Sequence, residues 1–195
     1  KSVIFAGSLC KKFRKEIFNF KKEAYLISDI KKDKIINDKF IKNDKIKVGI
    51  SWKSVVSIYG KLKSLNLHDF KDLFKSNRQI ISLQYGDVEN ELKKMEDKNY
   101  KIYSFDEINL FDDIDACMSL LKNLDVFVTV SNSTAHLAAS MGVKTILICP
   151  KKSSTYFYWS NEKNETPWYQ NVTIIQLNDS VRQTISKIDK IINNL

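Results

Sequence analysis

Residues 125–150 constrain the fold of this chain more than any other segment. Two apolar runs, Val126–Val130 and Thr145–Cys149, have the length and composition of buried strands. Between them lie a polar turn at Ser131–Thr134 and a segment of small residues with helical spacing, Ser133–Met141. A strand, a helix and a second strand in this order favour a parallel sheet. The turn at Ser131–Thr134 is then the start of a helix that follows a buried strand.

The same alternation continues through the chain from Lys47 onward. Further strands are predicted at Lys47–Trp52, Gln79–Gln84, Lys101–Phe105 and Val172–Leu177. Further helices are predicted at Leu67–Phe74, Val88–Lys98, Ile114–Leu124 and Val181–Leu195. In the third of these, Asp112 or Asp113 can cap the start of the helix. We expect one apolar stripe along it, formed by Ile114, Cys117, Met118, Leu121 and Leu124. The chain is therefore predicted to be α/β, a Rossmann-like parallel sheet with helices on both faces.

The length of 195 residues suits one well-buried domain. Residues 11–47 are dense in Lys, Asp and Asn, which indicates a helical or irregular connector. The chain also lacks an initiating Met, so we expect it to be a piece of a longer protein. Residues 46–195 are the predicted Rossmann-like domain, and residues 1–45 precede it.

The net charge of +9 suggests anionic partners, but it does not indicate a specific nucleic-acid binder. Base readout favours arginine, and only Arg14, Arg78 and Arg182 are present among 32 basic residues. We expect a solvated surface with some affinity for anionic ligands or a peripheral membrane surface. The three cysteines have no metal-ligand spacing, and no apolar run approaches the length of a membrane span. The expected location is cytoplasmic, with the inner face of the membrane as an alternative.

The helix start after Val126–Val130 carries the clearest candidate site. Hydroxyl and amide side chains, free helix N–H groups and the helix dipole would converge there, which suits a phosphate group. The candidate residues are Ser131, Asn132, Ser133, Thr134 and, about one turn later, His136. Two alternatives stay open: an ordinary helix cap without a ligand, and a histidine that is a packed core residue.

Polar residues also follow two other predicted strands. Hydroxyl groups and lysines after the strand at 47–52 suit a diphosphate, and a glutamine after the strand at 79–84 suits a ribose or base edge. These candidates are Ser51, Trp52, Lys53, Lys61, Lys63, Gln84 and Tyr85. The alternatives are a surface loop with incidental lysines and a plain strand-to-helix turn.

Aromatic residues cluster at 156–159 and 167–169, where they could stack on a ligand or pack a long loop onto the domain. The glycine fingerprint of dinucleotide-binding proteins, the Walker loop and the hydrolase nucleophile elbow are absent from the sequence. Their absence argues against a nicotinamide enzyme, an NTPase and an α/β-hydrolase.

With these residues identified, the chain resembles the C-terminal, donor-binding half of a GT-B glycosyltransferase. The resemblance is to the heptosyltransferase-like group, glycosyltransferase family 9-like and including tetratricopeptide-associated domains. It covers roughly residues 46–177 through KVGISWKS, KLKSLNLHDF, ISLQYGD, FDDIDACMSLLKNLDVFVTVSNSTAHLAASMGVKTILICP and PWYQNV.

The resemblance implies a metal-independent transferase without a cofactor. One domain would bind a nucleotide-diphosphate sugar, and a preceding domain would bind a glycan, lipid or protein acceptor and supply the catalytic base. Residues 1–45 would contain the end of that first domain and a linker. The residues that would match the phosphate-binding helix start are Ser131, Asn132, Ser133 and His136. Lys61 or Lys63 would neutralise the diphosphate, and Gln84 would contact the nucleoside.

Two residues depart from the family pattern. Ser131 stands where the family often has Asp, and Ser133 stands where heptosyltransferases proper have Gly. The main expectation is sugar transfer, with the chain alone inactive if its acceptor domain is missing. The alternative is a non-catalytic nucleotide-sugar-binding or scaffold module.

Overall fold

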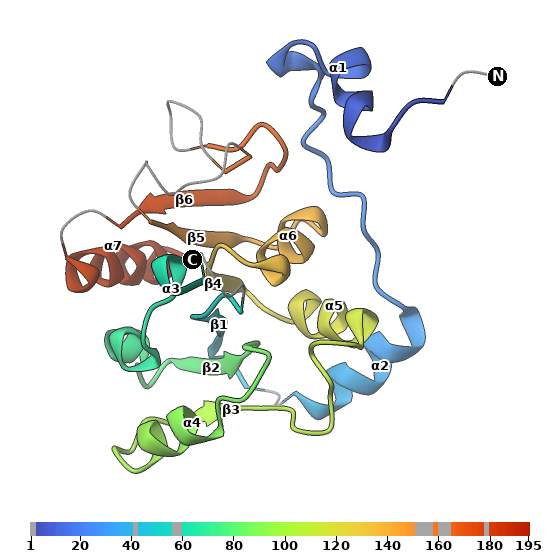
Figure 1. The fold of residues 1–195 in the computed structure, drawn as a ribbon. Helices are drawn as coiled ribbons and strands as arrows, with labels where there is room; N and C mark the ends of the chain where they lie inside the picture. The colour runs from blue at the N-terminus through green and yellow to red at the C-terminus, as the bar shows by residue number, and fades with distance from the viewer. Residues whose placement is uncertain (1–2, 41–42, 56–59, 151–157, 160–164, 178–179) are drawn as a thin grey trace.

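A computed structural model describes residues 3–40, 43–55, 60–150, 158–159, 165–177 and 180–195. Its centre is one six-stranded sheet in the order β3-β2-β1-β4-β5-β6, and every neighbouring pair is parallel (Figure 1). The strands are β1 (Ile46–Ser51), β2 (Arg78–Ser82), β3 (Ile102–Tyr103), β4 (Val126–Val130), β5 (Thr145–Cys149) and β6 (Val172–Gln176). The predicted Rossmann-like fold is confirmed.

Helices cover both faces of the sheet (Figure 1). One face packs on the 3₁₀ helix η3 (Leu67–Leu73), on α4 (Glu89–Glu96) and on α7 (Val181–Asn193). The other face packs on α2 (Ile30–Lys39), α5 (Ile114–Lys122) and α6 (Ser133–Ser140). The short helix α3 (Gly60–Lys63) follows β1.

The central strands are buried because apolar side chains point from them to both faces. Every residue of β2, β4 and β5 is buried, as expected for parallel strands covered on both sides. Gly49 of β1 lets α5 and its neighbours approach the sheet closely. A Cβ atom there would lie 2.3 Å from a methyl carbon of Leu124 and 2.9 Å from one of Leu83.

One part of the predicted apolar stripe on α5 is wrong. Asp113 caps the helix by accepting a hydrogen bond from the Ala116 N–H group at 2.9 Å, as expected for one of the two aspartates. Ile114, however, is 54% exposed, whereas Cys117 and Leu121 are buried. Ile114 is the first residue of α5, so its side chain lies at the end of the helix, where the core does not enclose it.

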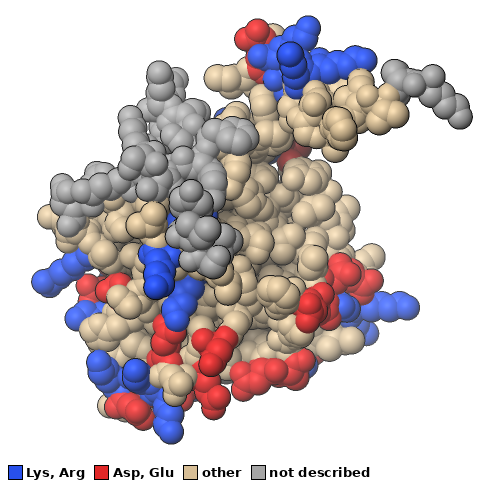
Figure 2. Space-filling model, in the orientation of Figure 1, with Lys and Arg blue, Asp and Glu red and all other residues tan. Residues whose placement is uncertain are grey.

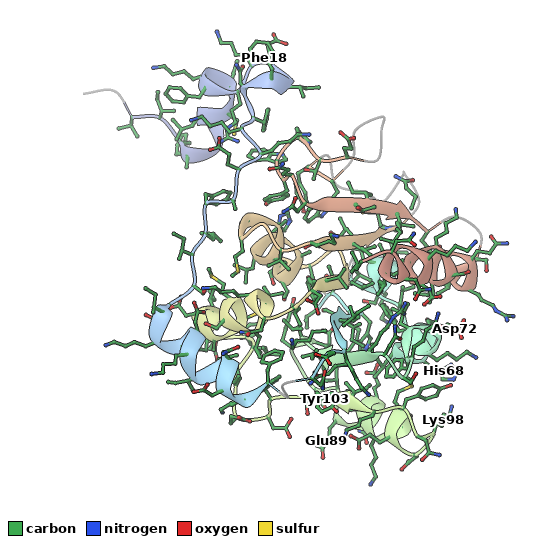
Figure 3. All side chains as sticks on the ribbon, turned by 180° about the vertical axis from the view of Figure 1, so that it is seen from behind. Phe18, His68, Asp72, Glu89, Lys98 and Tyr103 are labelled. Carbon is green, nitrogen blue, oxygen red and sulfur yellow. The ribbon has the colours of Figure 1, made fainter. Side chains whose placement is uncertain are left out.

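Residues 3–20 form an arm that extends from the sheet (Figure 1). It contains η1 (Ala6–Ser8), α1 (Leu9–Phe13) and η2 (Ile17–Asn19). Figure 3 shows Phe18 on this arm, far from the sheet, and its side chain is 83% exposed. In contrast, α2 is docked on α5 through Ile36 and Phe40, which are buried in the same apolar cluster as α5. Part of the predicted connector therefore packs with the domain, and the boundary at residue 46 stays a prediction.

Among the described residues, no helix has the length and apolar character needed to cross a lipid bilayer.

Candidate functional site

The strand order reverses between β1 and β4, and this switch point defines the candidate site. β1 pairs with β2 on one side and with β4 on the other, so the crossovers run in opposite directions from here. Ligands of such sheets bind beyond the carboxyl ends of the strands at this position. The residues that follow β1 and β4 are the predicted candidates Trp52, Lys53, Ser131 and Asn132.

Asn132 joins the ends of β1 and β4. Its Oδ1 atom accepts a hydrogen bond from the Ala135 N–H group at 3.0 Å and so caps α6. Its Nδ2 atom donates to Ser51 Oγ at 2.8 Å and to the Lys53 carbonyl oxygen at 3.3 Å. The predicted cap is confirmed, and the same side chain fixes the α6 start against the loop after β1.

Gln84 adds the end of β2 to this arrangement. Its Oε1 atom accepts three hydrogen bonds, from Ser51 Oγ at 3.0 Å, Trp52 N at 2.9 Å and Lys53 N at 2.7 Å. Its Nε2 atom donates to the Tyr85 carbonyl oxygen at 2.9 Å. We call Gln84, Ser51 and Asn132 the switch-point network. All three side chains are buried, and they hold three strand ends together. A direct contact of Gln84 with a nucleoside stays a prediction.

The side chains of Trp52 and Lys53 turn toward α4 rather than toward α6. Trp52 Nε1 donates to Glu91 Oε2 at 2.9 Å, and the Lys53 ammonium group forms an ion pair with the same carboxylate. The positive charge of Lys53 is therefore already compensated.

At the start of α6, the side chains of Ser131 and Ser133 have different surroundings. Ser131 Oγ is buried and accepts a hydrogen bond from Trp159 Nε1 at 2.9 Å. Ser133 is exposed, and Thr134 is buried beside it. The first N–H groups of a helix have no partner within it. Because Asn132 takes the Ala135 N–H group, those of Ser133 and Thr134 are left at the helix start, where the dipole favours an anion.

The structure separates the two candidate lysines of α3. Lys61 is exposed to solvent, whereas Lys63 is buried. Burial lowers the pKa of His136 and raises the pKa of Cys149, and the positive charge of Lys63 makes a smaller, lowering contribution to both.

His136 lies in an aromatic enclosure. Its ring stacks on Trp159 with centroids 4.2 Å apart and meets Tyr158 edge-on at 5.0 Å. Its Nδ1 atom is 2.9 Å from the Tyr169 hydroxyl oxygen. Burial, with a smaller contribution from Lys63, lowers the pKa of His136 from 6.5 to about 4. The ring is therefore neutral at pH 7.

The lowered pKa of His136 predicts a pH dependence of stability. The unfolded chain binds a proton near pH 6.5 and the folded chain only near pH 4, so the stabilisation is complete above pH 6.5 and is lost as the pH falls toward 4. We expect His136→Gln to flatten the slope of unfolding free energy against pH in this window. Urea unfolding at several pH values measures the slope. Equal slopes for the variant and the unchanged protein would contradict the shift.

A cavity of about 580 Å³ adjoins the switch-point network at the ends of β2 and β3. Its lining includes Gln84, Tyr85, Asp87, Phe105, Asp106 and Phe111. Figure 2 shows acidic side chains gathered at the lower centre and right of the face in view, near the edge of the sheet that carries β2 and β3, with basic side chains at the lower left. The two ends of the candidate site therefore differ in charge.

The structure thus brings together Ser51, Gln84 and Asn132, and the charge of Lys63 contributes to the lowered pKa of His136 on α6. It leaves Lys61 on the surface. Sequence reasoning missed the bonds from Trp159 to Ser131 and from Tyr169 to His136, although both aromatics lie in the clusters it singled out. For Trp159, the prediction that an aromatic packs the loop is confirmed, since its side chain is 0% exposed. Tyr156 and Phe157 lie outside the described residues.

No family model matches the chain. Protein FlbA of Caulobacter vibrioides is 28% identical to it over 135 residues, which are 65% of this chain and 21% of FlbA. The chain therefore spans about a fifth of the length of this curated relative.

Three solved structures share the fold. A glycosyltransferase family 9 protein from Veillonella parvula matches with a TM-score of 0.61 and 10% identity over 88% of this chain and 54% of its own. E. coli ADP-heptose LPS heptosyltransferase II matches with a TM-score of 0.59 and 11% identity over 87% and 53%. E. coli heptosyltransferase WaaC with ADP-2-deoxy-2-fluoro heptose matches with a TM-score of 0.53 and 10% identity over 83% and 47%. The chain spans about half of each, and its predicted resemblance to these glycosyltransferases is confirmed at the level of the fold.

Proposed function

We propose that this chain is the donor half of a heptosyltransferase-like glycosyltransferase and binds a nucleotide-diphosphate sugar at the β1–β4 switch point. The observation that carries the proposal is the α6 start at the end of β4, where the first helix N–H groups are free of partners within the helix and neutral His136 is within range of the charge of buried Lys63. Helix N–H groups and a lysine stabilise a diphosphate electrostatically. The fold shared with three glycosyltransferases supports this assignment.

The charge distribution orients the ligand in this proposal. The diphosphate lies at α6, where Lys63 and the helix dipole supply positive charge. The nucleoside enters the cavity at β2 and β3, where Tyr85 and Phe111 provide aromatic surface and Asp87 and Asp106 can accept hydrogen bonds from ribose hydroxyl groups. A cavity of about 580 Å³ lies within the usual range for small-molecule sites.

The proposed reaction is transfer of the sugar to a glycan, lipid or protein acceptor. As the glycosidic bond to the diphosphate breaks, negative charge grows on the departing phosphate oxygen. Lys63 and the α6 N–H groups stabilise that charge without a required metal ion. The base that activates the acceptor lies outside these residues. We place the reaction in the cytoplasm, with a peripheral membrane surface as a further site of action.

Binding without transfer is the second candidate function, and Ser131 favours it. The resembling family often has Asp at this position, whereas here a serine hydroxyl is bound to Trp159. The test is an assay of the full-length protein with both donor sugar and acceptor present. Binding of the donor without its consumption would support this candidate.

The two lysines of α3 give a direct test. Lys63→Met should weaken binding of an ADP-, UDP- or GDP-sugar about tenfold, because one charge-assisted hydrogen bond to the diphosphate contributes about 1.5 kcal/mol. Lys61→Met, two residues away and exposed, is the matched control and should change affinity less than about twofold. Isothermal titration measures both, with thermal unfolding as a check of folding. Equal losses in the two variants would refute the assignment of Lys63.

A further inference from the structure

Three hydroxyl groups, those of Tyr25, Ser140 and Tyr169, lie near His136, where the segment before α2 contacts α6. The backbone N–H groups of Tyr25 and Leu26 both donate to the Ser140 carbonyl oxygen, at 2.9 Å and 3.1 Å. Ser140 Oγ donates to the Tyr25 hydroxyl oxygen at 2.9 Å. The segment before α2 is thus fixed to the last turn of α6 by three hydrogen bonds.

Tyr169 connects this group to His136. Its hydroxyl oxygen lies 2.9 Å from His136 Nδ1, and the hydroxyl groups of Ser140 and Tyr25 are near enough to contribute to its pKa. Burial raises the pKa of Tyr169 to about 12, so the phenol keeps its proton at pH 7. Tyr169 therefore always has one O–H to donate and an oxygen that can accept.

Packing fixes the ring plane of His136. It does not determine whether the ring proton is on Nδ1 or on Nε2. The indole of Trp159 lies nearly parallel to the imidazole, at an interplanar angle of 23°. A neutral imidazole has one N–H group and one acceptor nitrogen. If Nδ1 accepts from Tyr169, the proton is on Nε2, and Nε2 can donate to a phosphate oxygen. In the opposite tautomer Nε2 presents a lone pair, which repels a phosphate oxygen.

We propose that Tyr169 is a positioning residue for His136: its hydroxyl group donates to Nδ1 and so keeps the ring proton on Nε2, which can then donate to an anionic ligand. The inference rests on the proposed function for the identity of the ligand, a nucleotide diphosphate. The tautomer itself can be measured without any ligand.

The test is the ¹⁵N spectrum of the histidine rings in the full chain and in Tyr169→Phe. The chain has two histidines, and Figure 3 shows the second, His68, on η3 away from α6, so it serves as an internal reference. The unchanged protein should show a pyridine-like Nδ1 and a pyrrole-like Nε2 for His136. Tyr169→Phe keeps the aromatic ring but removes the hydroxyl group, and it should shift the signals toward a mixture of tautomers.

A second readout connects the tautomer to the ligand. Tyr169→Phe should weaken binding of ADP about tenfold. Tyr100→Phe is the matched control, because Tyr100 packs on Phe74 before β3, at the opposite edge of the sheet, and it should leave the affinity unchanged.

Two outcomes separate this inference from the proposed function. The positioning role is refuted if Nε2 carries no proton in the wild-type protein, or if Tyr169→Phe leaves the tautomer as it was. Either result holds whatever the ligand affinity. If the unchanged protein binds neither ADP nor an ADP-, UDP- or GDP-sugar at millimolar concentration while folded, the proposed function fails, even where the tautomer responds to Tyr169→Phe as expected.

Discussion

Replacement of Gln84 by leucine should lower the free energy of unfolding by about 3 kcal/mol, because buried donors that lose their acceptor keep their full desolvation penalty. The Gln84 Oε1 atom accepts from the N–H groups of Trp52 and Lys53 and from the Ser51 hydroxyl group. Leucine fills a similar volume but accepts nothing. Urea unfolding monitored by tryptophan fluorescence measures the loss.

Gln79→Leu is the matched control for this substitution. Gln79 lies on β2, the strand that Gln84 follows, and is 2% exposed, but its Oε1 atom has no hydrogen-bond partner among the described residues. The same chemical change should therefore cost at least about 2 kcal/mol less there. Similar losses at the two positions would show that the acceptor role of Gln84 does not stabilise the fold.

Trp159→Ala should cost about 4 kcal/mol, the usual range for removing a fully buried aromatic side chain. The indole is 0% exposed and packs in the apolar cluster formed by α6, β5 and β6. It also stacks on His136 and donates to Ser131. The variant should therefore lose order at the α6 start as well as stability, and both can be followed by thermal unfolding and amide NMR.

Trp168→Ala tests whether this loss is specific to the position of Trp159. Trp168 belongs to the second aromatic cluster but is only partly buried, where it meets Phe20 edge-on at 4.8 Å. Trp168→Ala should lower the free energy of unfolding by about half as much as Trp159→Ala or less, because Trp168 buries less apolar surface on folding. An equal or greater loss from Trp168→Ala would contradict the packing role given to Trp159.

The sheet could be predicted from the sequence because its central strands are continuous apolar runs. The bounds predicted for β4 and β5 match the structure, and those for β1, β2 and β6 differ by one or two residues at an end. The predicted helix at 67–74 is a 3₁₀ helix in the structure. The helix α3 was not predicted, because a four-residue segment that begins with a glycine is too short to show a helical period.

The site was predictable in its residue types but not in its contacts. Hydroxyl and amide side chains after strands indicated a ligand-binding edge, and the structure does bring Ser51, Gln84 and Asn132 together there. Which of them bond to each other depends on strand register, such as the pairing of Ile50 with Ser82. Single-sequence patterns carry no such long-range information. The same holds for Lys61 and Lys63, whose different burial follows from the path of the chain after β1.

The most direct test of the central claim is amide NMR of the chain titrated in turn with an ADP-, a UDP- and a GDP-sugar. If a diphosphate binds at the β1–β4 switch point, the N–H signals of Ser133, Thr134 and Ala135 should move first and furthest. Those of Lys45 and Lys144, at the opposite ends of the strands, should stay in place. Saturable shifts confined to the α6 start and the β2–β3 cavity would agree with the account. Shifts centred elsewhere, or none at millimolar ligand, would contradict it.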